Sequence, residues 1–226
     1  MNRYKWYRLD RPGSHRSLVK SILGRKFQNG SSSGFFSIED QTDNKGFRFA
    51  WETLIPKTSF GVTGSPSVEL ISTVSFCEFS LFELGGTTWL RAVNPPRSLK
   101  ELMNALEESI GFGFAAELIS FERAALPKSL SKLKDVSLIG FKAIGLVPKP
   151  HAVARIEVAA RDGLELGSLD FLKHISYEID QAVYEITFQR IRGQIALSST
   201  GLVKISGQLA PFVLHLIETD LIAGHN

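Results

Sequence analysis

The sequence predicts an α+β fold class, in which helices cover a mostly antiparallel β-sheet. Strand-like runs of alternating apolar residues follow one another through short turns, which is typical of antiparallel pairing. Two amphipathic helical segments, residues 98–110 and 209–222, follow such runs and lie about half a chain apart. This order leaves open a chain built from two similar β-α-β-β-β-α halves, although the residues show no internal repeat.

The hairpin that precedes the last helix gives the most detailed expectation. A three-residue loop would pair Ile195 with Ile205 and provide a left-handed position for Gly201. The same register pairs Leu197 with Val203, so that four apolar side chains share one face. A slip of one residue, as a two-residue turn would impose, scrambles that face. We therefore predict the three-residue loop.

The closing segment, residues 193–222, has the order strand, Ser-Ser-x-Gly, strand, Gly, helix. This order resembles the closing part of a repeat in TATA-box-binding-protein-like domains. The resemblance concerns topology, and it implies only an antiparallel hairpin under a helix.

The N-terminal elements are predicted from alternation and from helix signals. Ser14 is a cap for a short helix whose apolar stripe comprises Leu18, Val19, Ile22 and Leu23. The expected elements are a strand at 3–9, a helix at 15–23, a flexible loop at 29–34 and a short strand at 35–38.

The middle of the chain is predicted to be rich in strands. Residues 47–55 alternate well, and Pro56 is expected to end that strand. In the run 68–84 the apolar residues change parity near Cys77, so we expect either a bulge there or two separate strands. A further strand is expected at 87–93.

The helix at 98–110 is expected to start with a capping box formed by Ser98 and Glu101. Residues 112–125 are apolar with interspersed charges, and their pattern does not distinguish helix from strand. Residues 127–135 are polar and basic, which is typical of a linker.

The remaining elements alternate between strand and helix patterns. Two strands at 136–147 and 152–160 are expected to form a hairpin, and Ser168 is expected to cap a helix that extends to about Ile179. A strand follows at 183–191, and Gly193 is expected to turn the chain into the closing hairpin. The organisation predicted from these elements is an N-terminal α+β unit with a basic region (1–126), a linker (127–135) and a C-terminal α+β unit (136–226).

Composition limits the class of protein. The chain has 226 residues, 43% of them hydrophobic and 22% charged, which is typical of a globular protein with a real core. It contains no run of about 18 apolar residues, so no membrane partner is predicted. Cys77 stands alone, which excludes an intramolecular disulfide and a cysteine zinc site. With no apolar secretory segment at the N-terminus, a cytoplasmic location is expected.

A search for catalytic motifs finds none of the common ones. The sequence has no Walker loop, no Gly-x-Gly-x-x-Gly after a strand, no histidine pair at helical spacing and no Glu-x-Lys nuclease signature. His174 and Ser176 fit half of a phosphodiesterase-type His-x-Ser signature, which needs a second copy. Glu157 and Glu185 could meet across a sheet, but a structural role is favoured. We therefore predict no catalytic residue, no metal and no cofactor, and we lean towards a non-enzyme.

Charge is the clearest functional signal. Residues 1–30 hold eight basic residues against Asp10 alone, a local balance of +7, so the rest of the chain sums to −4 within a total of +3. Such a region favours contact with a DNA or RNA backbone. The residues predicted to contact phosphate are Arg8, Arg11, Arg16, Lys20, Arg25 and Lys26. Lys204, expected opposite Ala196 on the outer face of the closing hairpin, is a further contact candidate.

The leading expectation is thus a non-enzymatic cytosolic subunit that binds nucleic acid or a nucleoprotein assembly through its basic N-terminal region. The alternative is a protein-interaction or scaffold subunit of a multiprotein complex, because the same region could dock an acidic protein surface. An enzyme with an unfamiliar site, acting on phosphodiesters, is the third hypothesis.

Overall fold

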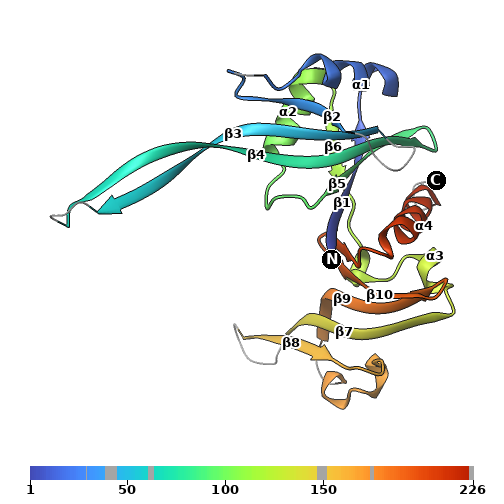
Figure 1. Cartoon of the computed structure of the whole chain (residues 1–226). Helices are drawn as coiled ribbons and strands as arrows, with labels where there is room; N and C mark the ends of the chain where they lie inside the picture. The colour runs from blue at the N-terminus through green and yellow to red at the C-terminus, as the bar shows by residue number, and fades with distance from the viewer. Residues whose placement is uncertain (29, 39–44, 61–63, 147–151, 174–175, 224–226) are drawn as a thin grey trace. The chain divides into compact units, whose positions relative to one another are not determined.

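The computed structural model describes residues 1–28, 30–38, 45–60, 64–146, 152–173 and 176–223. Within them, four α-helices accompany one large sheet (Figure 1). The helices are α1 (His15–Gly24), α2 (Lys100–Ile110), α3 (Lys128–Ser131) and α4 (Ala210–Ala223). The strands are β1 (Asn2–Asp10), β2 (Ser33–Ile38), β3 (Lys45–Phe60), β4 (Pro66–Leu84), β5 (Thr87–Val93), β6 (Ala115–Leu118), β7 (Asp135–Leu146), β8 (Val153–Ala159), β9 (Ser176–Phe188), β10 (Ile191–Ser198) and β11 (Val203–Ile205).

Hydrogen bonding links the strands in the order β2-β3-β4-β5-β1-β11-β10-β9-β7-β8, with β6 paired to β1. The hairpin pairs along this path are antiparallel, as expected. The chain divides into two compact units, residues 7–117 and residues 1–6 with 118–226, and β1 contributes to both. Residues 127–135 include α3 and belong to the second unit. Their role as a linker stays a prediction.

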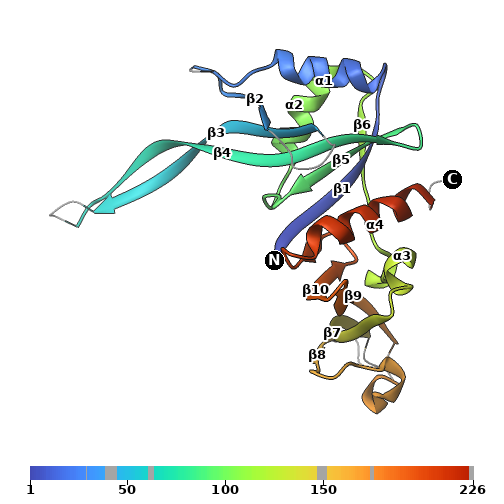
Figure 2. The same ribbon diagram turned by 45° about the vertical axis from the view of Figure 1, so that its right-hand side comes forward.

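In the unit of residues 7–117, α1 and α2 lie on the same side of β3 and β4 (Figures 1 and 2). Their buried side chains meet a cluster of phenylalanines on the covered face of the sheet, in which the rings of Phe35 and Phe49 have centroids 5.0 Å apart. The thiol of Cys77 is buried in the same core. Burial, and then the charge of Glu78, raise the pKa of Cys77 to about 12.

The helix predictions of this unit are confirmed with two corrections. Ser14 caps α1 as expected, because its side chain accepts a hydrogen bond from the Ser17 amide. Leu23, however, is exposed and does not join the buried stripe. The predicted capping box of α2 is wrong: the helix starts at Lys100 after a Leu99 cap that makes no side-chain hydrogen bond.

Two strand predictions of this unit are also wrong. Pro56 does not end β3, which continues to Phe60. Trp51 is the last residue of β3 that lies opposite β2. Beyond it, β4 is the described neighbour of β3, so the other side of β3 is an edge. Edge positions tolerate proline, which has no N–H group to donate. Strand β4 is continuous, and its register with β3 runs unbroken from Pro66 to Leu81 without a bulge.

The closing hairpin of the second unit is confirmed in detail. Ile195 pairs with Ile205 and Leu197 with Val203, and all four side chains are buried. Gly201 has a φ of +79°. The turn before β10, however, is formed by Gln189 and Arg190, both with positive φ. Gly193 therefore lies within β10 instead of forming a turn. A Cβ there would come within 2.6 Å of the Leu209 side chain.

The helix predicted from Ser168 to Ile179 is absent from the described residues of this segment. Short 3₁₀ turns occupy Leu166–Ser168 and Asp170–Leu172, and β9 starts at Ser176. The reason is tertiary: Leu172, Tyr177 and Ile179 pack on a small core around Phe141 and Ala143. Tyr177 and Ile179, two residues apart, therefore place their side chains on the same face of a strand there. The order of elements therefore does not confirm two similar halves.

Candidate functional site

Three of the six predicted phosphate-contacting residues are engaged within the protein. Arg8 Nη2 lies 2.8 Å from Glu117 Oε2 and 3.9 Å from Asp10 Oδ2. The Arg11 guanidinium donates two hydrogen bonds to Thr88 Oγ1, at 3.0 and 2.7 Å.

Arg25 is held in a similar way. Its Nη1 lies 2.5 Å from Glu108 Oε2 and donates to the Ala105 carbonyl oxygen, while its Nη2 donates to Ser33 Oγ. These bonds tie α1 to α2 and to β2. Acidic partners thus neutralise Arg8 and Arg25, two of the eight basic side chains of residues 1–30, in partly exposed ion pairs that add little stability.

The other three predicted residues, Arg16, Lys20 and Lys26, are exposed. In the part of the chain that the structure describes, none of them forms an ion pair. Arg16 and Lys20 lie one helical turn apart on α1, and Lys26 follows the helix. Next to Lys26, the rings of Phe27 and Phe36 lie 5.5 Å apart, and Phe36 is 41% exposed. The structure therefore leaves three cations exposed, and the exposed ring of Phe36 packs on Phe27, the sequence neighbour of Lys26.

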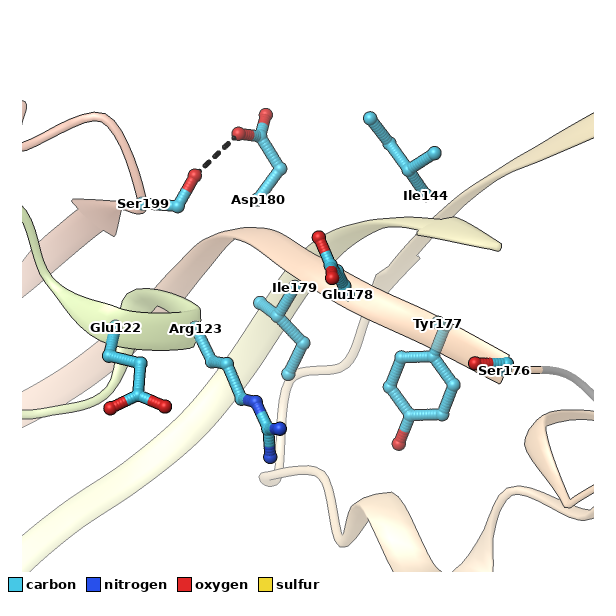
Figure 3. Close-up of a pocket in the computed structure, with 9 residues that line it drawn as sticks. All are labelled: Glu122, Arg123, Ile144, Ser176, Tyr177, Glu178, Ile179, Asp180 and Ser199. Atoms are coloured by element: carbon cyan, nitrogen blue, oxygen red, sulfur yellow. Dashed lines mark hydrogen bonds between the residues drawn. The ribbon is translucent and has the colours of Figure 1, made fainter. Parts of the chain in front are cut away.

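A pocket of about 600 Å³ opens in the second unit, where β9 passes the 3₁₀ turn Glu122–Ala124. Figure 3 shows Ser199 facing Asp180, and Ser199 Oγ donates to Asp180 Oδ1 at 2.9 Å. No histidine is among the described residues that line this pocket, so the described lining gives Ser199 no histidine partner of the kind that activates a nucleophilic serine. Among the described residues, no three His, Cys, Asp or Glu side chains lie close enough to hold a metal ion.

The other predicted catalytic candidates are not brought together. His174 lies outside the described residues. Glu157 on β8 and Glu185 on β9 are separated by β7, which lies between those two strands. Each carboxylate instead has a cation beside it: Glu157 Oε1 lies 2.9 Å from Lys142, and Glu185 Oε1 lies 2.6 Å from Arg192. Their structural role, favoured from the sequence, agrees with these contacts.

The most unusual surface is the outer part of the β3–β4 hairpin. We define the arm as residues 52–60 of β3 and 66–76 of β4. Strand β2 stops opposite Trp51, and β5 pairs with β4 only from Glu78 onward, so the described arm is a two-stranded ribbon. Figures 1 and 2 show it extending well away from α1 and α2. No helix among the described residues covers the arm.

The unbroken register assigns every arm residue to one of two faces, because directly opposite residues project to the same side of an antiparallel pair. One face continues the buried side of the sheet that carries Phe49 and Cys77. On the arm this face is mainly polar and holds Thr53, Lys57, Ser59, Ser67, Glu69, Thr73 and Ser75, with Ile55 opposite Ile71. We call it the polar face.

The opposite side, which we call the apolar face, carries six large apolar side chains, each more than half exposed. Their exposed fractions are 59% for Leu54, 74% for Phe60, 66% for Val68, 62% for Leu70, 56% for Val74 and 57% for Phe76. Pro56 and Pro66 are exposed on the same side. At the base of this face, the Arg48 guanidinium carbon lies 4.9 Å from the centre of the Phe76 ring. A row of exposed apolar side chains of this length makes this face a candidate interaction site.

Sequence reasoning missed this surface although its signal was present. The parity change near Cys77 marks the point where the apolar residues of β4 leave the covered face and continue on the open one. The expectation of a bulge or of two separate strands rests on the rule that a strand keeps its apolar residues towards the core.

No family model matches this chain, and no curated protein matches it at a significant level. No helix within the described residues is both long and apolar enough to cross a membrane.

Proposed function

We propose that this protein is a non-enzymatic interaction subunit, which binds an apolar protein surface through the apolar face of the arm. The observation that carries this proposal is the exposure of six large apolar side chains on one face of an isolated ribbon. Single apolar residues on a protein surface are ordinary, but a contiguous row is rare outside binding sites.

The energetics of the arm support this function. A two-stranded hairpin alone is marginally stable in water, because it buries little apolar surface. Fully burying one side chain such as Leu70 or Phe60 contributes about 1.5–3 kcal/mol. A partner that covers this face therefore gains binding energy and stabilises the ribbon at the same time.

The charge of the arm does not fit a nucleic acid as its partner. Its charged residues are Glu52, Lys57 and Glu69, which sum to −1. Phosphate backbones are bound by clusters of lysine and arginine. The polar face, rich in serine and threonine, is suited to remain in water while the apolar face is covered.

A test of this proposal uses two neighbouring positions on opposite faces. A photoreactive amino acid is placed at position 68, on the apolar face, or at position 67, on the polar face, and the cells are irradiated. We expect a defined cross-linked protein adduct from position 68 and much less from position 67. Equal adducts from both positions, or none from either, would contradict the proposal. Mass spectrometry identifies the partner, including another copy of this chain.

Nucleic-acid binding is a second candidate function, favoured by the exposed cations Arg16, Lys20 and Lys26 and by the exposed ring of Phe36. Cations that follow the backbone and an aromatic ring that stacks on a base are the features of single-strand binding. Three phosphate contacts predict a slope of about −2 in log affinity against log salt. The third hypothesis, an enzyme acting on phosphodiesters, stays a prediction.

The nucleic-acid candidate is tested by changing the three cations to alanine together. We expect binding to a labelled single-stranded oligonucleotide to weaken strongly and its salt dependence to flatten. Lys57→Ala, which removes a lysine from the arm, is the matched control and should bind like wild type. If the triple variant binds as tightly as the control, these residues do not form the site.

A further inference from the structure

The apolar face of the arm has a symmetric order of side chains. Each step along this face is a pair of opposite residues, with Ala50 opposite Phe76 at the base and Phe60 opposite Pro66 at the tip. Each step holds one large side chain of the six defined above. From base to tip the large side chains are Phe76, Val74, Leu54, Leu70, Val68 and Phe60. The order of side-chain types is therefore the same in both directions.

We propose that the occupant of the apolar face is the same face of a second copy of this chain, an inference that rests on the proposed function. A two-fold axis can pass through the middle of the arm, between the steps of Leu54 and Leu70. It maps the row of six large side chains, read from base to tip, onto the same row read from tip to base. It places the step of Leu70 in one copy against the step of Leu54 in the other. It likewise sets the step of Val68 against that of Val74, and the step of Phe60 against that of Phe76. Facing steps thus carry large side chains of the same type, directly opposite for the two valines and diagonal across the two strands for the leucines and phenylalanines, so the interface is self-complementary.

The exposed area is sufficient for a stable dimer. Six large apolar side chains that are 56–74% exposed present on the order of 700 Å² per copy, given areas of roughly 150–250 Å² for large side chains. Two copies then bury about 1,400 Å², within the range of about 1,200–2,000 Å² for specific interfaces. Face-to-face packing of two ribbons corresponds to the geometry of a β-sandwich.

Charges are also compatible with this two-fold arrangement. Glu52 is the charged residue of the apolar face within the arm, and it shares a step with Val74. The axis places that step against the step of Thr58 and Val68, so the Thr58 hydroxyl can donate to the Glu52 carboxylate of the other copy. Lys57 and Glu69 belong to the polar face and stay in water. No like charges on the arm are brought together.

The experiment measures the mass of the full chain in solution by sedimentation over a range of concentrations. We expect the 25.0 kDa chain to form a dimer. In the dimer, Leu70→Asp would bury one carboxylate from each copy, so it should raise the dissociation constant of the dimer at least 100-fold. Ser67→Asp, on the polar face, is the matched control and should dimerise like wild type. Circular dichroism verifies that both exposed-site variants remain folded.

A mixture of two variants tests the register. Leu54→Lys should also be monomeric alone, but its mixture with Leu70→Asp should form a mixed dimer, because Lys and Asp would then lie on facing steps, within reach of each other across the interface. A dimer that Leu70→Asp does not weaken, or variants that do not complement, would overturn the proposed contact. A monomeric wild type that cross-links another protein through position 68 would overturn this inference alone. A monomer with no adduct would overturn the proposed function as well.

Discussion

Substituting Gly201 by alanine should strongly destabilise the closing hairpin. Gly201 combines a φ of +79° with close contact to a neighbouring backbone: a Cβ would lie 2.0 Å from the Ile119 carbonyl oxygen. Real Cβ atoms essentially never approach a heavy atom within 3.0 Å. The oxygen cannot move freely, because the Ile119 amide donates to the Trp6 carbonyl at 3.0 Å.

The magnitude follows from two separate costs. The left-handed backbone costs a non-glycine residue about 1–2 kcal/mol. Displacing the segment at Ile119 adds about 1–3 kcal/mol, as overpacking in a core does. We therefore expect Gly201→Ala to lower the free energy of unfolding by about 2–5 kcal/mol in total.

Urea denaturation followed by circular dichroism measures this change, and two other glycines serve as controls. Gly86 has a φ of +77° with nothing within 4 Å of its Cβ position, so Gly86→Ala tests the backbone cost alone. Gly207 also has open space around its Cβ position, without a left-handed φ, and should tolerate alanine. If Gly201→Ala loses no more stability than Gly86→Ala, the close contact with Ile119 is not a constraint.

Further predictions concern buried groups. Cys77 should resist a thiol reagent at pH 8 in the native protein and react rapidly in denaturant, because it is buried and protonated; fast native labelling would contradict its placement. Burial raises the pKa of Cys77, Tyr7 and Tyr184, so their protonated forms stabilise the fold below about pH 9 and this contribution is lost as pH rises towards 12. A urea midpoint of unfolding that does not decrease as the pH rises from 9 to 11 would refute this expectation. Trp6→Phe removes the indole N–H that donates to buried Glu218 at 3.1 Å. It should lower the free energy of unfolding, measured in urea, by about 1–3 kcal/mol. An unchanged urea midpoint would show that this hydrogen bond contributes nothing to stability.

The amino-acid sequence determined the parts of this fold that depend on local chemistry. The register of the closing hairpin follows from four apolar residues and one glycine, because a slip would expose all four side chains. The α1 cap at Ser14 is a contact within a few residues, and the stripe of Leu102 and Leu106 on α2 follows from their helical spacing, so a sequence pattern records both directly.

Tertiary structure decided the features that depend on distant residues. Segment 176–179 became a strand because Tyr177 and Ile179 pack on Phe141, a residue on another strand. Three of the six predicted phosphate-contacting residues are engaged within the fold, because Glu117 and Glu108 lie beside Arg8 and Arg25, and Thr88 accepts from Arg11. Charge counted along the chain does not show which carboxylates folding brings close.

The arm shows most clearly where sequence reasoning stopped. Alternation identifies which residues share a face of a strand, and it placed Val68, Leu70, Val74 and Phe76 together. Whether that face is covered depends on where β2, β5 and the helices end, and those ends are set by packing elsewhere in the unit. A strand pattern therefore determines the two faces of a ribbon, but only the tertiary fold decides which face is left open to a partner.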